Sequence, residues 1–245
     1  MNIKRYGIDA PFALLIYTAF GVGLVLHAYV NRLNYPIGIE MTLGIILLLG
    51  ALLFLHTTAQ GKYRLFDEAI RHLNLTPDSQ VLDLGCGRGA LLTKIAQQLG
   101  PAGKVTGLDL WLSRDQSHNK ITVTQKNVDD LGLTNRVNLV TGDMTKLDFP
   151  DASFDVVMSS FAIHNIKNEQ ARINAVKEAI RVLKPGGHIM IIDTGRNINE
   201  YGQAFRDAGL QITQSMSLGF NGWWATPLID SYVVAGNKPT NKTAK

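Results

Sequence analysis

The chain has 245 residues, enough for one large α/β domain or two small ones. Hydrophobic residues make up 46% and charged residues 18%, a composition too apolar for a disordered protein and slightly rich for a soluble domain. The net charge of +4 includes Lys238, Lys242 and Lys245 near the C-terminus, so the remaining body is close to neutral and has no basic stripe, which argues against a nucleic-acid partner.

Two segments near the N-terminus contain no charged side chain: residues 10–31 and residues 41–61. Each is long enough to cross roughly 30 Å of hydrocarbon as a helix. We therefore predict a transmembrane helical hairpin over residues 1–60, with spans at about 11–30 and 37–58. Two alternatives remain open. The first span could be a cleaved signal peptide, although a second span follows at once, or the hairpin could be buried inside a soluble protein.

Positive charges flank the two spans unevenly. They are Lys4, Arg5, Lys62 and Arg64 outside the hairpin, against Arg32 in its loop, which Glu40 offsets in part. The positive-inside rule predicts that both termini lie in the cytoplasm, and with them the C-terminal domain.

Beyond the hairpin, residues 63–75 have the spacing of an amphipathic helix, and strands then alternate with helices. The predicted strands cover residues 81–84, 105–110, 137–141, 154–159, 188–193, 211–217 and 231–235. The predicted helices cover residues 91–99, about 116–131, about 169–183 and about 200–208. This alternation predicts a doubly wound α/β domain over residues 61–238, with a seven-stranded, mainly parallel sheet covered on both faces. The last two strands predict an antiparallel pair, and residues 239–245 a disordered tail.

The first strand leads into a glycine turn, Val81-Leu82-Asp83-Leu84-Gly85-Cys86-Gly87-Arg88-Gly89. Glycines permit φ > 0 in a tight strand-to-helix turn and let a cofactor lie against bare backbone at a helix N-terminus. Dinucleotide-binding folds use such a turn too, so it is a weak signal alone. Asp83, two residues before the first glycine, has no place in the G-x-G-x-x-G turn of those folds. The turn with Asp83 resembles motif I of class I S-adenosylmethionine-dependent methyltransferases, and the resemblance covers about residues 63–238.

The resemblance implies that S-adenosylmethionine lies across the carboxyl ends of the strands. The glycine turn would face the amino-acid part of this cofactor, and Asp83 would reach its ammonium group directly or through water. The turn residues concerned are Gly85, Cys86, Gly87 and Gly89.

The next strand ends supply the remaining candidate cofactor contacts. Asp109 ends the second strand, where a carboxylate suits the ribose hydroxyls, and Leu110 follows beside the expected adenine. A helix-capping role for Asp109 is the alternative. Gly142-Asp143-Met144 follows the third strand, and there Asp143 would accept a hydrogen bond from the adenine amino group. Ser159, near the end of the fourth strand, is also expected to border the cofactor.

His164 follows the fourth strand and is the candidate general base near the expected methyl group. A neutral imidazole could take a proton from an acceptor hydroxyl or amine during the transfer. Methyl transfer depends largely on positioning, however, and often needs no base. A merely polar residue at a strand end is therefore the alternative for His164.

Three further sequence features bear on the fold, the cofactor and the substrate site. Leu183-Lys184-Pro185-Gly186-Gly187 is expected to end a helix and turn sharply into the fifth strand, as is common in small-molecule methyltransferases of this class. Cys86 is the only cysteine, so neither a disulfide nor a metal site is predicted. The aromatic cluster Phe220, Trp223 and Trp224, with Pro227, could cover a substrate pocket, sit at a bilayer interface or simply pack.

Together these features predict a membrane-anchored S-adenosylmethionine-dependent methyltransferase acting on a small or lipid-soluble acceptor, such as a quinone precursor or a lipid headgroup. The membrane is an expected partner, and nucleic acid is not. The alternative is a non-catalytic S-adenosylmethionine-binding membrane interaction protein, although the intact set of acids argues against it. A nucleotide-dependent oxidoreductase does not fit the glycine spacing or Asp83. The sequence indicates neither the particular acceptor nor the oligomeric state.

Overall fold

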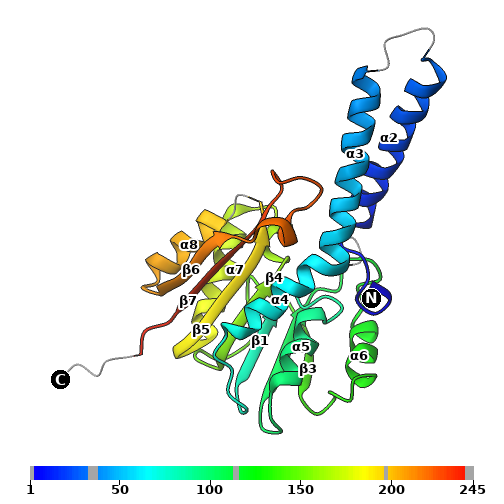
Figure 1. Cartoon of the computed structure of the whole chain (residues 1–245). Helices are drawn as coiled ribbons and strands as arrows, with labels where there is room; N and C mark the ends of the chain where they lie inside the picture. The colour runs from blue at the N-terminus through cyan, green and yellow to red at the C-terminus, as the bar shows by residue number, and fades with distance from the viewer. Residues whose placement is uncertain (1–2, 33–37, 113–115, 196–197, 241–245) are drawn as a thin grey trace.

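The computed structural model describes residues 3–32, 38–112, 116–195 and 198–240. Residues 33–36 of the predicted hairpin loop (31–36), residue 37 at the start of the second predicted span, and residues 241–245 of the predicted tail lie outside the described residues. Figure 1 shows a long helical hairpin near the N-terminus that stands on an α/β domain.

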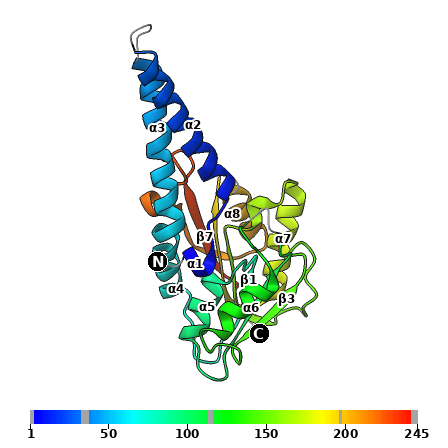
Figure 2. The same ribbon diagram turned by 90° about the vertical axis from the view of Figure 1, so that its right-hand side faces the viewer.

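The hairpin consists of α2 (Pro11–Val30) and α3 (Gly38–His56), which pack along each other. Their backbones come close at two glycines, since a Cβ on Gly44 would lie 2.9 Å from the Gly21 carbonyl oxygen. By length and composition alone, α2 and the helix that begins at Gly38 could each cross a membrane, and only 11% and 22% of their most apolar stretches is buried. The hairpin projects away from the domain (Figures 1 and 2) and is not part of the core of the α/β domain.

One continuous helical path joins the hairpin to the domain. α3 passes through the π-helical turn η1 (Thr57–Gly61) into α4 (Lys62–Arg71), the amphipathic helix predicted from the sequence. α4 buries Leu65, Phe66 and Ala69, and Phe66 and Ala69 belong to the domain core. A short helix, α1 (Ile3–Tyr6), precedes the hairpin and lies on the domain as well.

The domain contains the seven-stranded sheet that the sequence predicted. Its strands are β1 (Gln80–Leu84), β2 (Lys104–Asp109), β3 (Val137–Thr141), β4 (Phe154–Ser160), β5 (Leu183–Thr194), β6 (Gln211–Ser217) and β7 (Ser231–Asn237). They lie in the order β3-β2-β1-β4-β5-β7-β6. The pairs among β1 to β5 are parallel, and β7 runs antiparallel to both β5 and β6. The antiparallel pair predicted for the last two strands, β6 and β7, is confirmed. β7 lies between β6 and β5 in the sheet.

Alternate residues of each strand face opposite layers of helices, as the strand period requires. On one face, Val81 and Val105 contact the core built with α4, α5 (Ala90–Gln98) and α6 (Ile121–Asp129). On the other face, Leu82 contacts the core built with α7 (Glu169–Val182) and α8 (Ile198–Asp207). The sheet is therefore covered on both faces, and the doubly wound fold is confirmed.

Two local predictions are wrong. The helix expected from residue 116 begins only at Ile121, because Gln116 and Asn119 are held in contacts with distant residues. The segment 183–187 follows the end of α7 at Val182, as expected, but it is the first part of β5 and not a turn before that strand; its register against β4 shifts there, and Gly186 has a φ of +79°. There the Gly186 N–H donates to the Lys238 carbonyl and the Lys238 N–H donates to the Gly187 carbonyl, which pairs the segment with the chain that follows β7.

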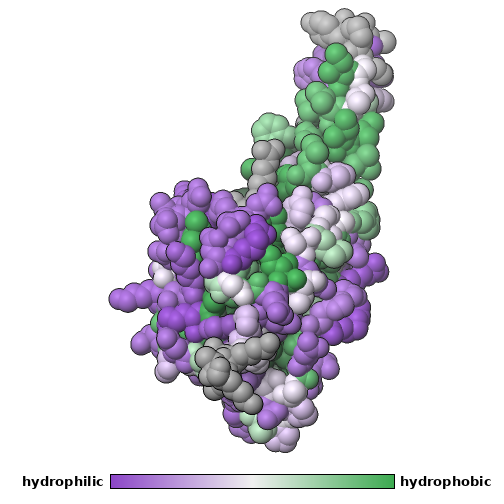
Figure 3. Space-filling view, turned by 90° about the vertical axis from the view of Figure 1, so that its left-hand side faces the viewer, coloured by the Kyte–Doolittle hydropathy of each residue, from purple (hydrophilic) through white to green (hydrophobic). Residues whose placement is uncertain are grey.

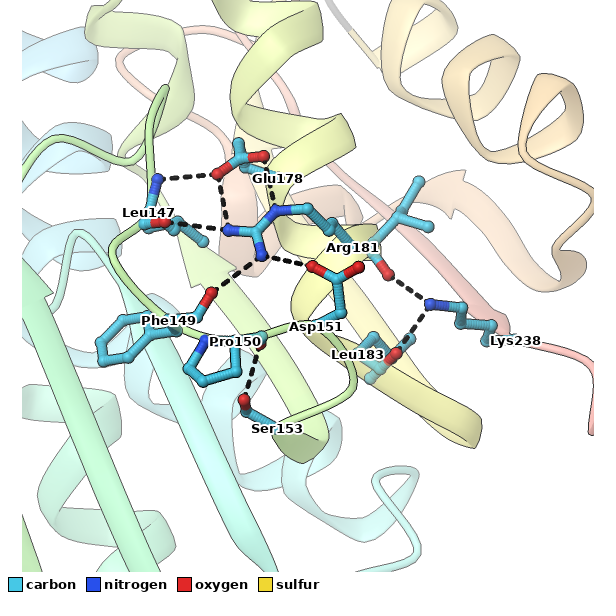
Figure 4. A network of polar contacts seen from close by, with 10 residues as sticks. Leu147, Phe149, Pro150, Asp151, Ser153, Glu178, Arg181, Leu183 and Lys238 are labelled. Atoms are coloured by element: carbon cyan, nitrogen blue, oxygen red, sulfur yellow. Dashed lines mark hydrogen bonds and ion pairs between the residues drawn. The ribbon is translucent and has the colours of Figure 1, made fainter.

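An arginine network fixes the long loop between β3 and β4, which carries Asp143 and Met144 at its start (Figure 4). The Arg181 guanidinium on α7 donates to both Glu178 oxygens at 2.8 and 2.9 Å and to the Asp151 carboxylate at 2.7 Å. It also donates to the Leu147 and Phe149 carbonyls at 2.9 and 2.8 Å. One side chain thus ties α7 to this loop at three points, Leu147, Phe149 and Asp151, while Glu178 on α7 itself holds the guanidinium in place.

We expect Arg181→Met to lower the free energy of unfolding by about 2 kcal/mol, because it leaves two carboxylates and two carbonyls without their charged donor. Urea denaturation followed by tryptophan fluorescence measures the change. The matched control is Arg206→Met, since Arg206 is exposed and donates only to the Gln203 side chain among the described residues. Equal losses in the two variants would contradict this role for Arg181.

Candidate cofactor and substrate site

A cavity of about 870 Å³ opens at the carboxyl ends of β1 to β4, beneath the foot of the hairpin. Most of the predicted site residues line it: Gly85, Cys86, Gly87, Asp109, Leu110, Gly142, Asp143, Met144 and His164. Asp83, Gly89 and Ser159 are not part of its lining. The topology brings these residues together because the ends of parallel strands meet at one edge of the sheet.

The glycine turn has the backbone form that its sequence indicated. Gly85, Gly87 and Gly89 have φ values of +75°, +51° and +83°, which side-chain-bearing residues rarely adopt. Close neighbours also exclude a side chain at two of them. A Cβ on Gly85 would lie 2.2 Å from the Ala162 Cβ, and one on Gly87 would lie 2.6 Å from Gln116 Oε1. Bare backbone therefore faces the cavity.

Asp109 holds the turn in place. Its Oδ2 accepts a hydrogen bond from the Gly87 N–H at 2.8 Å, and its Oδ1 accepts from the Trp111 N–H at 2.6 Å and the Asn119 amide at 3.1 Å. Each carboxylate oxygen has lone pairs for more than one donor, so this network is compatible with a ligand hydroxyl. Asp143 is exposed at the opposite side, where its Oδ1 caps the Thr145 N–H at 2.8 Å.

Asp83 lies under the turn and is fully buried. Neither of its carboxyl oxygens accepts a well-formed hydrogen bond from the described residues. Burial raises the pKa of Asp83 to about 7, and the neighbouring Asp109 carboxylate contributes to the rise, which a contact with the Leu92 backbone offsets only in part. A cation on the other side of the thin glycine turn would favour the ionised form.

The two remaining predicted residues, Ser159 and Gly89, make hydrogen bonds within the fold. Ser159 is buried and donates to the Leu84 carbonyl across the β1–β4 pair at 2.9 Å, while its neighbour Ser160 lines the cavity. Gly89 is the N-cap residue of α5, and its carbonyl accepts from the Thr93 hydroxyl at 2.7 Å.

His164 is part of a buried hydrogen-bond network that the sequence did not reveal. Its Nδ1 contacts Oδ1 of Asp193, and its backbone N–H donates to Oδ2 of Asp193 at 2.9 Å. The Tyr201 hydroxyl donates to Oδ2 at 3.1 Å as well, so the carboxylate is anchored. Asp193 lies near the end of β5. Since Asp109 was selected because it ends a predicted strand, the same criterion applied to the predicted strand 188–193 would have identified Asp193.

The N-terminal segment supplies polar contacts that the sequence analysis also missed. Lys62, which is only 2% exposed, donates to Asp9 Oδ2 at 2.5 Å, and both residues line the cavity. Asp9 also accepts from the Gln116 amide at 3.1 Å, and Gln116 Oε1 accepts from the Arg88 N–H at 2.9 Å. No local pattern predicts these pairs, because their partners are far apart in the sequence.

The part of the cavity toward the hairpin is apolar. It is lined by residues of α2, α3, the β4 end and the loop between β6 and β7: Ala13, Tyr17, Phe54, Phe161, Trp224 and Ile229. Phe161 and Trp224 meet edge to face at 5.3 Å, and Phe54 and Trp224 at 5.2 Å. Among the aromatics singled out in the sequence, Trp224 therefore covers the pocket, whereas Phe220 is exposed and lies 4.6 Å from the His56 ring.

Comparisons with known proteins agree with this fold. Residues 75–218 match the family model described as a methyltransferase domain. "Demethylmenaquinone methyltransferase" of Listeria welshimeri is 35% identical over 139 residues, covering 56% of this chain and 55% of the relative. The protein with the same name from Lysinibacillus sphaericus is 31% identical over 141 residues, covering 57% and 55%. The chain thus spans about half the length of the curated relatives it matches.

Solved structures share the fold. A geranyl diphosphate methyltransferase in complex with S-adenosylmethionine gives a TM-score of 0.57 at 16% identity, covering 72% of this chain and 85% of that one. The [4+2]-cyclase SpnF gives 0.61 at 18% identity, covering 75% and 84%. SpnF is a cyclase by name, so proteins of this fold do not all share one reaction. These structural similarities therefore show the architecture and not the reaction.

The fold and the glycine-turn cavity define a class I methyltransferase architecture. The chain belongs to the methyltransferase domain family. The predicted membership of a methyltransferase family is therefore confirmed.

In the ligand-free protein, the Asp83 pKa predicts that the free energy of unfolding falls as the pH rises from 5 to 8. A folded pKa of about 7 lies above the ordinary value of 3.8, so the folded state binds the proton more tightly and loses this advantage on deprotonation. The wild type should lose about 3 kcal/mol more than Asp83→Asn over this range, as measured by urea denaturation at each pH.

Asp207→Asn is the control, because Asp207 is exposed on α8 and should leave the pH dependence unchanged. If the wild type and Asp83→Asn lost stability equally, Asp83 would already be ionised in the fold at pH 5.

Proposed function

We propose that this protein is a membrane-anchored S-adenosylmethionine-dependent methyltransferase that methylates a lipid-soluble, quinone-like acceptor. The observation that carries the proposal is the composition of the cavity. The glycine turn and strand ends line one part, and the feet of two helices of membrane-spanning length line the other. A water-soluble acceptor would have no need of that second part.

The cofactor part of the cavity has the donors and acceptors that S-adenosylmethionine requires. The backbone of Gly85 and Gly87 offers a side-chain-free surface, and the buried Asp83 beneath it suits a neighbouring ammonium group. Asp109 is assigned to the ribose hydroxyls and Asp143 to the adenine amino group, with Met144 packing beside it. When bound, the cofactor supplies an electrophilic methyl group on a sulfonium.

The chain's own contribution to the chemistry is positioning and proton transfer. Because His164 Nδ1 engages the buried Asp193 carboxylate, Nε2 is the atom that we assign to accepting the acceptor's proton. Asp193 fixes the ring orientation and favours the tautomer with the proton on Nδ1. The surrounding aromatic side chains keep water away from the reacting atoms.

Two facts support a quinone-like acceptor in a membrane. The relatives' printed name refers to demethylmenaquinone, although they match only half their length. The helices of the hairpin expose apolar side chains along their length, which Figure 3 shows above a largely hydrophilic domain surface. Lys62 is paired with Asp9 and contributes no free surface charge, so the cytoplasmic orientation is supported by Arg5 and the exposed Arg64.

Calorimetry tests the cofactor assignment. S-adenosylhomocysteine should bind with micromolar affinity, and Asp109→Asn should weaken binding at least about tenfold, because the ribose loses a charged acceptor. Asp207→Asn should bind as the wild type does. Binding of NADH in place of S-adenosylhomocysteine would overturn the assignment.

Transfer of a labelled methyl group tests the reaction. In detergent or nanodiscs, the protein should label an isoprenoid naphthoquinol that lacks the ring methyl. His164→Gln should lower kcat by about 100-fold or more with little change in KM, since only proton transfer is lost. Asp193→Asn should lower kcat as well and alter the pH profile of kcat. If membrane extracts gave no labelled lipid-soluble product while soluble extracts did, the acceptor class would be wrong.

A further inference from the structure

The loop between β6 and β7, residues 218–230, has an unusual exposed surface. Leu228 is 95% exposed, and the neighbouring Ile229 and Phe220 are also largely exposed. Residues 218–229 contain no charged side chain, and Asp230 at the loop's end is buried, where its carboxylate accepts from the Ser217 hydroxyl. Several apolar side chains therefore face outward without a charge among them.

The 218–230 loop lies against the base of the hairpin. Ala225 touches α3, since a Cβ on Gly50 would lie 3.1 Å from the Ala225 carbonyl oxygen. Gly50 precedes His56, the last residue of α3, by six residues, which is about 9 Å along a helix. The loop thus extends beside the apolar helix, as Figure 1 shows for the segment that precedes β7.

The tip of the 218–230 loop satisfies much of its own backbone. The Trp224 N–H donates to the Ile229 carbonyl at 2.8 Å, and the Ile229 N–H donates to the Thr226 carbonyl at 3.1 Å. The Leu228 N–H donates to the Thr226 hydroxyl at 3.0 Å, and Pro227 has no N–H. A loop with few unpaired donors can enter a poorly hydrating layer at low cost.

The same loop borders the cavity. Trp224 and Ile229 line its apolar part, and Ile229 is also exposed on the outside. The loop therefore separates the cavity from the surface beside α3.

From these observations we propose that the 218–230 loop inserts into the membrane beside α3, at the boundary of headgroups and acyl chains, and forms the doorway through which a lipid-soluble acceptor reaches the cavity. The occupant of this surface is lipid, because the surface is uncharged, apolar and continuous with helices of membrane-spanning length. The inference rests on the proposed membrane anchoring and on the lipid-soluble acceptor.

Site-specific labelling tests the insertion. Cys86, the only native cysteine, is buried and burial raises its thiol pKa, so it should label slowly and the wild type serves as the blank. Leu228→Cys carries an environment-sensitive fluorophore in nanodiscs. Leu49→Cys, 59% exposed on α3, is the lipid-facing reference, and Gln98→Cys, exposed at the end of α5, is the water-facing reference.

The label at position 228 should be quenched at least twofold by acyl-chain nitroxide lipids and be protected from iodide, as at position 49. Quenching by iodide alone, as at position 98, would overturn the proposal. Protection from both quenchers would also overturn it, because a second copy of the chain or another protein would then cover the loop.

Kinetics test the doorway. Leu228→Asp should raise KM for a long-chain naphthoquinol at least tenfold, while turnover of a short-chain, water-soluble analogue stays within twofold. Met216→Asp, a matched change at a 58% exposed position on β6, should leave both unchanged. If Leu228→Asp leaves KM for the long-chain naphthoquinol unchanged, the 218–230 loop is not the entrance for the acceptor, even though the enzyme methylates it. If no quinol is methylated at all, the proposed function fails, and the labelling result still decides the insertion.

Discussion

The ion pair between the partly exposed Asp9 and the buried Lys62 fixes the hairpin to the glycine turn, and the shape of the cavity depends on that attachment. Asp9 lies just before α2, and Lys62 lies where the helical path from α3 enters the domain. Gln116 extends the contact to the Arg88 N–H in the glycine turn. Removing Asp9 would leave the ammonium group of Lys62 as an uncompensated buried charge, which is costly. The hairpin is therefore a wall of the site as well as a candidate anchor.

The glycine turn lies beside two aspartates whose charges add to the effect of its shape on ligand binding. Asp83 and Asp109 are two buried carboxylates on neighbouring strands, and burial together with the Asp109 charge raises the pKa of Asp83. Asp109 is stabilised by donors from Gly87, Trp111 and Asn119, whereas Asp83 has no such set. This asymmetry leaves one unsatisfied acid beneath bare backbone, an arrangement suited to a bound cation.

The proposed membrane association accounts for the apolar part of the cavity. An apolar chamber that opens beside two long helices would cost stability in water unless a ligand or lipid covered it. With the 218–230 loop at the bilayer surface, the acceptor would move from lipid into the chamber without crossing bulk water. His164, held by Asp193, lines the same cavity, and under the proposed function it would take up the proton of the acceptor there.

The sequence by itself determined the elements whose signals are local. The β-branched strands, the glycine turn with Asp83, and the acids Asp109 and Asp143 were all recognisable, because strand period and turn chemistry act over a few residues. The late start of α6 and the inclusion of residues 183–187 in β5 were not, because backbone pairing and side-chain contacts with distant segments override local propensity there.

Only the tertiary structure decided the partners of the site: Asp193 behind His164, and Asp9 with Lys62 beside the turn. Asp9 is separated from Gln116 by 107 residues, and His164 from Asp193 by 29. Such pairs have no sequence period, since they arise when the sheet and the hairpin pack in three dimensions.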